Sequence, residues 1–533
     1  MERKLTKLNH MLIAILIVAQ PFIIMFQAMV VRDIQVFGLS VFESFNIVLS
    51  VFCLILTIYL SSNKRKFLKY IPYVAVLGLY MLIHIYNTYQ FNNSIYPAQT
   101  PSFLVETYYI GRTFMVPFFV LFSVYYSGMK KEQLIKILEI LLFVVVFVMV
   151  STNLFGIALR NYTEGNVISE VNLFDWFTFE NTSKYSYYKI TTKGWFLSGN
   201  QMSAVLFMTF LITTYRAYNK RDMFHYILMT LQMMAMFMLG TKVANGGSIL
   251  LLAGFFVMWC VFALLKHQKK SIFVIVAITL IFTLLIPFSP VGYMYRYRIG
   301  NDRAESLGDG SLIDNAMSID MDNTLDWDDK IYYLNLMMDS KTLYKLDSES
   351  LDEEEKEFVR TYMTKYYEYY GISPYIIENY DDLEHSEFWV RYLQKTPNND
   401  YRVLKTMILE DIYEKNDNIL DKYFGMGYTL NYIYTEADYS YQMYLYGIMG
   451  LLLFVGPYFY LLFVVVWKGL RNFKKLFNLE CAVYFLAPLS GLCVAKMSGH
   501  VLERSFPLMM VSITIAIVLL HVRETLSEKK EIV

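Results

Sequence analysis

Residues 136–157 read KILEILLFVVVFVMVSTNLFGI, an apolar run whose charged side chains stand only at its beginning. An α-helix needs about twenty apolar residues to cross the hydrocarbon core of a bilayer, so this run predicts a transmembrane helix. The whole chain has the same character, because hydrophobic residues make up 56% of its 533 residues and charged residues only 18%. Such a composition is typical of an integral membrane protein and not of a string of soluble domains.

Comparable apolar runs recur along the chain, and we expect each to form a membrane-spanning helix. They lie near residues 11–30, 37–60, 70–89, 106–127, 136–157, 195–215, 224–240, 247–265, 271–290, 441–467, 477–497 and 505–522. The first run is too long for the apolar core of a signal peptide, so we interpret it as a retained helix. The sequence therefore predicts an all-α integral membrane protein of about twelve transmembrane helices.

Basic residues predict how these helices are oriented, because clusters of lysine and arginine in short connections mark the cytoplasmic side of a membrane protein. Such clusters occupy alternate connections, at residues 64–69, 130–131, 216–221, 266–270 and 468–475. Both tails are basic as well. An even number of spans places all of these clusters on one side, so we expect both termini in the cytoplasm.

The opposite side carries one large polar loop. The chain then divides into residues 1–290 with nine helices, an extracytoplasmic loop at 291–437, and residues 438–533 with three helices and a cytoplasmic tail. Capping signals predict helices at 350–370 and 400–422, so we expect a mostly helical loop. Its acidic tracts, 320–329 and 347–357, fit a solvated face better than a calcium site, because neither has the ligand spacing of a calcium loop.

Several functional classes lose support. The formal net charge is zero and the basic residues do not form one face, so no nucleic-acid partner is expected. The four cysteines stand singly inside apolar runs, which argues against a disulfide framework or a thiolate metal site. The sequence has no phosphate-binding glycine loop, no His-Glu-x-x-His zinc motif and no Gly-x-Ser-x-Gly nucleophile motif. We expect neither a metal nor a cofactor.

Polar side chains gather at the predicted outer ends of the helices. A charged group at membrane depth costs on the order of 3 kcal/mol, so such residues are the default functional candidates. They are Arg112, Lys193, Asn200, Lys242, Arg402, Glu436, Asp438, His500 and Arg504. Alternatively, the lysines and Arg504 are interfacial anchors, the two carboxylates belong to a polar loop end, and His500 is a hydrogen-bonded structural residue.

Together these residues indicate a cationic outer site that also holds carboxylates and an imidazole. Partly dehydrated cations suit a phosphate or pyrophosphate, because they offset the charge that builds on such a leaving group. A carboxylate or imidazole within reach of a sugar hydroxyl can serve as its general base.

Short motifs in the C-terminal third resemble a known family. They are Phe424-Gly425-Met426-Gly427-Tyr428, Glu436-Ala437-Asp438-Tyr439, Gly447-Ile448-Met449-Gly450 and Gly499-His500-Val501. In this order they resemble the bacterial O-antigen ligase and polysaccharide polymerase superfamily of membrane glycosyltransferases. Ligases of that superfamily usually have a histidine eleven residues before a glycine, and here Glu436 stands eleven residues before Gly447. The chain thus looks like the branch, common in Gram-positive polymerases, that has Glu-x-Asp-Tyr at this place.

Upstream stretches extend the resemblance, which covers roughly residues 193–504. Lys193-Gly194-Trp195-Phe196 through Asn200 is similar to the family's Gly-x-Phe-x-x-x-Asn helix entry, and Gly240-Thr241-Lys242 is similar to its Ser/Thr-Arg/Lys turn. Arg402 is similar in place to the arginine of the family's Ser-Gly-Arg motif, although Asp400 and Tyr401 precede it here.

The resemblance implies a GT-C-type helical fold in the bacterial cytoplasmic membrane, with its active site on the outer face and no obligatory metal. The substrate would be an undecaprenyl-pyrophosphate-linked oligosaccharide, embedded in membrane lipid. An acceptor sugar hydroxyl would attack the anomeric carbon of this donor and expel undecaprenyl pyrophosphate with inversion. A chain-length regulator and a flippase are candidate partner proteins.

The resemblance also implies roles for individual residues. Arg402, Lys193 and Lys242 would hold the pyrophosphate. Glu436, or else Asp438 or His500, would take the proton of the acceptor hydroxyl. A glutamate in place of the ligases' histidine needs a raised pKa or strong orientation to act as a base at neutral pH.

Two other functions share this layout. A flippase or other transporter for lipid-linked sugars also has many spans, but transporters usually have short loops, paired halves and charged groups at the membrane midplane. A ligase shares the chemistry of a polymerase and differs in its acceptor. The preferred interpretation is a polymerase for a capsule, exopolysaccharide or O-antigen type of polysaccharide.

Overall fold

The computed structural model covers most of the chain with helices. It describes residues 2–29, 35–36, 39–96, 101–161, 166–169, 171–178, 190–266, 271–293, 380–395, 401–428, 433–435, 437–497 and 499–527, together with the single residues 353, 356, 357, 360 and 376. The predicted loop helix at 350–370 and both acidic tracts lie outside these residues, apart from four isolated positions.

The first part of the chain forms the helices up to residue 154. They are α1 (Glu2–Val18), α2 (Gln20–Met29), α3 (Val41–Leu60), the short helix η1 (Lys64–Tyr70), α4 (Ile71–Thr88), α5 (Phe103–Ile110), the π-helical turn η2 (Gly111–Met115), α6 (Val116–Tyr126) and α7 (Lys131–Leu154). A two-stranded hairpin, β1 (Gln35–Val36) and β2 (Leu39–Ser40), pairs Gln35 with Ser40.

The rest of the chain forms a second set. It comprises η3 (Leu173–Phe177), α9 (Gly199–Lys220), α10 (Met223–Leu239), α11 (Lys242–Lys266), α12 (Phe273–Leu285), η4 (Ile286–Phe288), η8 (Asp381–Glu384), α18 (Ser386–Lys395), α19 (Tyr401–Asn416), α20 (Ile419–Phe424), α21 (Asp438–Phe454), α22 (Gly456–Arg471), α23 (Phe473–Leu476), α24 (Leu479–Met497) and α25 (Ser505–Ser527). We call α18, α19 and α20 the cap.

A helix occupies each of the predicted spans, which confirms the all-α membrane class. Within the described ranges, nine helical segments are long and apolar enough to cross a bilayer, and two shorter apolar helices lie at Met223–Leu239 and Phe273–Phe288. α9 is as long as the others but carries more polar side chains. The number of actual crossings stays a prediction.

α25 lies at the centre of the bundle. It packs against α6 and α24, and its apolar segment is buried all round. α3 and α4 instead leave large apolar side chains exposed, among them Val48, Phe52, Leu79 and Leu82. An apolar helix with an exposed face suits contact with lipid, whereas a helix that is apolar all round belongs in the core.

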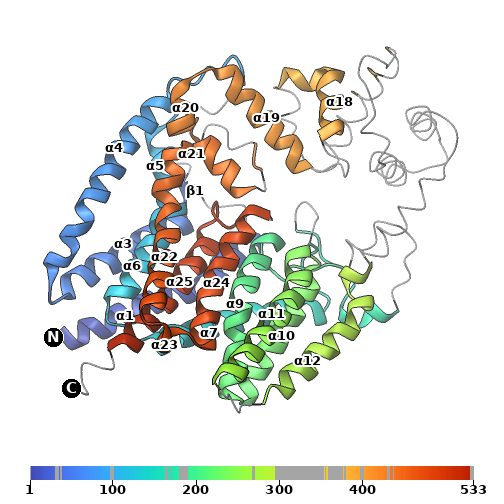
Figure 1. Cartoon of the computed structure of the whole chain (residues 1–533). Helices are drawn as coiled ribbons and strands as arrows, with labels where there is room; N and C mark the ends of the chain where they lie inside the picture. Colours follow the sequence, from blue (N-terminus) through green and yellow to red (C-terminus); the bar gives the residue numbers. More distant parts are fainter. Residues whose placement is uncertain are drawn as a thin grey trace.

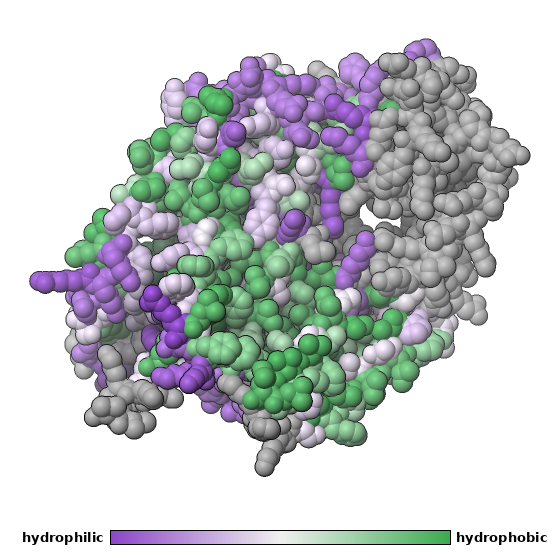
Figure 2. Space-filling view, in the orientation of Figure 1, coloured by the Kyte–Doolittle hydropathy of each residue, from purple (hydrophilic) through white to green (hydrophobic). Residues whose placement is uncertain are grey.

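The cap lies at one end of the bundle and both termini lie at the other (Figure 1). Figure 2 shows hydrophilic side chains over the cap and near the termini, with apolar side chains over the helices between them. The predicted helix at 400–422 is confirmed as α19 and α20. A break separates them at Asp417, whose φ is +44°, and Asn418 caps α20.

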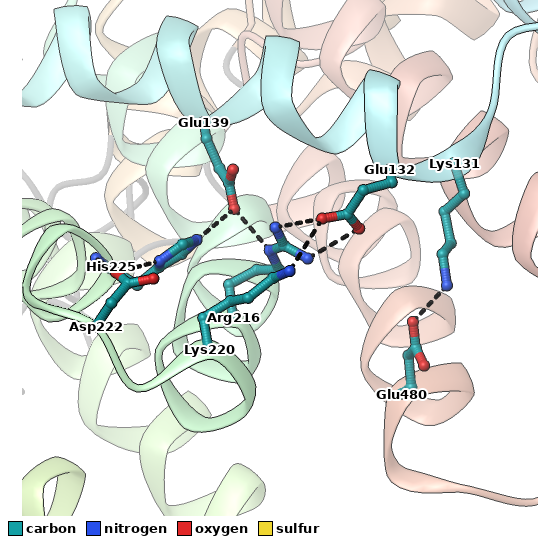
Figure 3. A network of polar contacts seen from close by, with 8 residues as sticks. All are labelled: Lys131, Glu132, Glu139, Arg216, Lys220, Asp222, His225 and Glu480. Carbon is teal, nitrogen blue, oxygen red and sulfur yellow. Dashed lines mark hydrogen bonds and ion pairs between the residues drawn. The ribbon is translucent and has the colours of Figure 1, made fainter.

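A network of charges ties helices together at the end that carries the termini (Figure 3). The Arg216 side chain is 4% exposed and pairs with Glu139 at 2.7 Å and with Glu132 at 2.8 Å. His225 contacts Asp222 through Nδ1 at 2.6 Å and Glu139 through Nε2 at 3.1 Å. These contacts join α7, α9 and the beginning of α10.

Candidate functional site

The segment Gly425-Met426-Gly427, part of the first motif of the family resemblance, packs on a kink in α21. Gly447 has φ +67° and ψ 178°, which is not a helical conformation. The carbonyls of Tyr444 and Leu445, which precede this kink, accept hydrogen bonds from the N–H groups of Met426 and Gly427, each at 2.9 Å. Two motifs about twenty residues apart therefore form one hydrogen-bonded turn.

Close backbone approach explains the glycines of this turn. A Cβ on Gly425 would lie 2.1 Å from the Leu445 carbonyl oxygen, and a Cβ on Gly427 would lie 2.1 Å from Thr88 Cγ2. Both glycines have positive φ, which L-residues adopt only with strain.

A buried acid–base pair supports the turn from α4 and α5. Glu106 accepts the Tyr428 N–H at 2.6 Å through Oε1, and its Oε2 lies 3.2 Å from His84 Nε2. His84 Nδ1 lies 2.6 Å from the Phe424 carbonyl, which can only accept, so Nδ1 carries a proton. The contact between His84 and Glu106 therefore needs a second proton that the two groups share.

Asp438, the first residue of α21, holds the connection between α24 and α25. Its Oδ1 accepts the His500 N–H at 2.8 Å, and its Oδ2 accepts the N–H groups of Val501 and Leu502 at 2.7 and 2.8 Å. The Tyr434 hydroxyl lies 3.4 Å from Oδ1. Asp438 is 0% exposed, so this carboxylate is fully occupied in fixing the backbone of residues 500–502.

The His500 imidazole stands beside two charged groups. His500 has φ +62°, directly after Gly499 at +65°. Its ring stacks on Tyr434 with centroids 4.8 Å apart, and its Nδ1 lies 3.0 Å from Glu503 Oε1. The same Glu503 oxygen accepts from Arg504 Nε at 2.6 Å. One carboxylate therefore contacts both an imidazole and a guanidinium.

The neighbouring cations keep the Glu503 carboxyl group ionised. Burial raises the pKa of Glu503, but Arg504, His500 and Arg112 lower it by more, so that it lies below the usual value. Glu503 in turn raises the pKa of Arg504. Burial and the nearby Glu503 raise the pKa of Tyr434, which therefore stays a hydrogen-bond donor.

Arg112 lies on the π-helical turn η2, a rare local structure that often occurs at functional sites. Its guanidinium lies 4.1 Å from the centre of the Tyr109 ring, which stacks on Tyr428. Among the residues that the structure describes, Arg112 makes no hydrogen bond or ion pair, and Arg504 uses only its Nε. The ends of both guanidinium groups can therefore donate to an anion.

A second polar group forms where the connection before α9 meets the turn between α10 and α11. The Thr192 N–H donates to the Met238 carbonyl at 2.8 Å, and Asn161 Nδ2 donates to the Leu239 carbonyl at 2.7 Å. α9 ends near Arg216 in the charge network, so its beginning lies at the opposite end of the bundle, toward the cap. The end of α24 lies there too, because residues 500–502 bind Asp438 at the start of α21, which packs against α20.

Lys193, Asn200 and Lys242 belong to this second group. The Lys193 side chain is buried, and burial lowers its pKa. Asn200 is the second residue of α9, and Lys242 begins α11 as an exposed residue directly after Thr241. Thr241 Oγ1 lies 2.6 Å from Ser203 Oγ of α9, which joins the two helix starts.

The predicted site residues that the structure describes thus lie in three places, one of which is the group of Lys193, Asn200 and Lys242 near the beginnings of α9 and α11. The structure brings Asp438, His500 and Arg504 together, whereas Arg402 lies half-buried near the beginning of α19 in the cap. Glu436 lies outside the described residues. The catalytic and binding roles of these residues stay predictions.

Sequence reasoning missed Glu503, Tyr434 and the His84–Glu106 pair. Glu503 had a signal, because it is a carboxylate beside Arg504 and three residues after His500, next to an apolar run. His84 and Glu106 each stand in a predicted span or at its edge, where a titratable group is costly unless it is paired.

No group of three or more His, Cys, Asp or Glu side chains in the described part of the chain has a geometry that could hold a metal ion. The site offers cations, one imidazole and carboxylates that are already bound to backbone or to cations. Such a set can bind a phosphate-bearing group and accept a proton.

A comparison with known families matches residues 6–525, nearly the whole chain, to the family described as O-antigen ligase like membrane protein. No curated protein and no solved structure matches the chain. Because the family model covers nearly all of the sequence, the chain belongs to this O-antigen ligase-like family of membrane proteins.

Proposed function

Because the chain belongs to this family, we propose that it joins undecaprenyl-pyrophosphate-linked oligosaccharide repeat units into a surface polysaccharide. Family membership makes it a multi-pass membrane enzyme that acts on polysaccharide or O-antigen, of the glycosyltransferase type. The polymerase activity and the lipid carrier go further than the family does. They rest on the chemistry of the site.

The observation that carries the proposal is an imidazole and a guanidinium that contact the same carboxylate oxygen. His500 lies 3.0 Å from Glu503, which binds Arg504, and Arg112 acts on Glu503 electrostatically. A glycosyl transfer to a hydroxyl needs a proton acceptor on one side of the anomeric carbon and cations around the leaving group on the other.

The reaction balances as a single displacement. The acceptor hydroxyl oxygen forms a bond to the anomeric carbon, and the bond from this carbon to the pyrophosphate oxygen breaks with inversion. Undecaprenyl pyrophosphate leaves with the electron pair. The hydroxyl proton passes to a base of the protein, for which Glu436 and His500 are the candidates, while Asp438 holds the loop.

The cations would neutralise the pyrophosphate. Among the described residues, the guanidinium ends of Arg112 and Arg504 have no hydrogen-bond partner, and both arginines act on Glu503. Asn200 near the beginning of α9, Lys242 at the beginning of α11, Arg402 in the cap and the buried Lys193 are the further candidates. Positive charge of this kind favours an anionic headgroup, and the lipid-exposed apolar helices suit its isoprenoid tail.

The basic connections support a location with the cap on the outer face of the bacterial cytoplasmic membrane and both termini inside. In this orientation residues 291–437 form the outer loop, between nine helices before it and three after it. Substrate then arrives from a flippase, and a chain-length regulator would act on the growing polymer.

A ligase is the second candidate, because the family description names ligases. It would use the same donor and the same displacement. The difference is the acceptor, which is the lipid-linked repeat unit for a polymerase and a different surface molecule for a ligase.

The test is the pattern of lipid-linked saccharides in a strain that lacks this protein, separated on a gel. The strain is complemented with wild type, Arg402→Ala, Lys242→Ala or the control Arg471→Ala, which lies at the opposite end of the bundle, at equal membrane levels. We expect single repeat units to accumulate outside in the deletion strain and with Arg402→Ala or Lys242→Ala. Wild type and Arg471→Ala should give a polymer ladder.

Two results would contradict the polymerase. If single units stay on the cytoplasmic face in the deletion, the protein moves lipid-linked sugars across the membrane. If a full ladder forms in the deletion but remains unattached to its surface acceptor, the protein is a ligase.

A further inference from the structure

Asp438 shapes the loop that carries His500. Three consecutive backbone N–H groups, of residues 500, 501 and 502, donate to its two oxygens at 2.7 to 2.8 Å. The Tyr434 hydroxyl lies 3.4 Å from Oδ1, and Asp438 is 0% exposed, so this carboxylate is surrounded by protein donors and does not face a substrate. Its role is to hold the loop in one conformation.

That conformation is one that a side chain rarely adopts. His500 has a φ of +62°, in the left-handed region that favours glycine. Its N–H is held by Asp438 and also lies 3.1 Å from the Tyr434 hydroxyl. Strained residues of this kind persist where the surroundings fix them, and they concentrate at functional sites.

The contact with Glu503 decides which ring nitrogen of His500 is basic. Glu503 is an ionised carboxylate that also accepts from Arg504, so it can only accept at Oε1. Nδ1, at 3.0 Å, must therefore carry the proton. In the neutral imidazole this leaves the lone pair on Nε2.

Nε2 is the ring nitrogen of His500 that can accept a proton from a substrate. It makes no hydrogen bond with any residue that the structure describes, and the side chain is 13% exposed. Tyr434 stacks on one face of the ring and limits its rotation. The Glu503 oxygen that contacts this imidazole also binds Arg504, and Arg112 acts on Glu503 electrostatically.

We propose that His500 Nε2 takes the proton of the acceptor hydroxyl, and that Glu503 is the positioning residue that fixes the imidazole in the tautomer needed for this step. As the hydroxyl oxygen bonds to the anomeric carbon and the pyrophosphate leaves, the proton moves to Nε2 and gives an imidazolium. Glu503 stabilises this cation at Nδ1–H. This inference rests on the proposed glycosyl transfer and assigns its base.

The experiment measures kcat and KM of chain extension by the full-length protein in proteoliposomes. The substrate is the lipid-linked repeat unit extracted from the deletion strain. The variants are His500→Gln, Glu503→Gln, the double variant, and Glu436→Gln. A His–Glu pair at the opposite end, His521 with Glu480 at 3.7 Å, supplies the matched control His521→Gln.

We expect His500→Gln to lower kcat roughly 100-fold or more, and Glu503→Gln about tenfold or more, with KM nearly unchanged. Since Glu503 acts through His500, adding Glu503→Gln to His500→Gln should lower kcat no further than about threefold. A merely structural role of Glu503 would lower the rate in both backgrounds. His521→Gln should keep the wild-type rate.

Two outcomes would overturn the inference. One is a kcat of His500→Gln within about threefold of the wild-type kcat while Glu436→Gln loses activity, because Glu436 would then be the base. The other is an undiminished effect of Glu503→Gln in the His500→Gln background. A wild-type protein that extends no chains would instead refute the proposed function itself. Thermal unfolding of each purified variant identifies any that fail to fold.

Discussion

Neighbouring cations favour the ionised form of Glu503. Arg504 and His500 contact its Oε1, and its pKa lies below the ordinary 4.5 although burial alone would raise it. A carboxylate whose pKa is lower in the folded state than in the unfolded state adds stability at pH values above its unfolded pKa. That contribution is lost as the pH falls through the folded pKa.

We therefore predict that the wild type is more stable than Glu503→Gln at neutral pH, and that this difference shrinks as the pH falls below about 4.5. Thermal unfolding of the two purified proteins between pH 7 and pH 3 measures it. A difference that grows toward acid would mean that Glu503 is protonated in the folded protein.

Gly427 is a residue that no other can replace at low cost. Its φ is +85°, and a Cβ would lie 2.1 Å from Thr88 Cγ2. We expect Gly427→Ala to destabilise the protein by more than about 2 kcal/mol, through strain and overlap. Gly78 has no atom within 4 Å of an added Cβ. Because alanine has the higher helix propensity, Gly78→Ala should be neutral or stabilising by up to about 1 kcal/mol.

Chemical denaturation or thermal unfolding in the same detergent compares these two glycine variants. Equal stability of Gly427→Ala and Gly78→Ala would show that the turn between α20 and α21 does not have the close packing described above.

At the scale of elements, the charge network between α7, α9 and α10 locks three helices at one end (Figure 3). Arg216 is nearly fully buried and pairs with Glu132 and Glu139, so Arg216→Ala leaves the buried Glu139 carboxylate with only His225 as a partner. The expected loss is about 3 kcal/mol. Lys220 is 42% exposed and 3.5 Å from Glu132, and its replacement by alanine should cost less than about 1 kcal/mol.

Thermal unfolding of Arg216→Ala and Lys220→Ala tests this difference. If the two variants lose the same stability, the buried network does not hold the helices together in the way that its geometry indicates.

The positions of the helices could be predicted from the sequence, because a lipid environment demands long apolar runs. The breaks within them could not. The run at 441–467 is one apolar stretch, yet it folds as α21 and α22 with a kink at Gly447 and a break at Val455. Only the docking of the Gly425–Gly427 turn explains the kink, and that contact joins segments about twenty residues apart whose pairing no local pattern indicates.

For the site, the sequence indicated which residue types gather at one end but not which of them touch. Asp438 and His500 were predicted as alternatives for one role. In the structure, Asp438 instead binds the backbone of the loop that carries His500. Glu503 was missed because a carboxylate beside an arginine at a helix end is common, and only the three-dimensional contact with the imidazole distinguishes it.

At the scale of the whole molecule, the positive connections predict which end faces the cytoplasm. We expect Glu387→Cys in the cap to react with a membrane-impermeant maleimide in intact cells, and Lys468→Cys at the other end to react only after the membrane is opened. The exposed native Cys493 is first replaced by serine. The reverse labelling pattern would place the proposed site in the cytoplasm.

The most direct test uses the purified protein alone, in proteoliposomes that contain the lipid-linked repeat unit extracted from the deletion strain. We expect products of two, three and more repeats, with one undecaprenyl pyrophosphate released for each new linkage. If the repeat units only cross the bilayer, with no new linkage and no released carrier, the protein is not a glycosyltransferase that joins them.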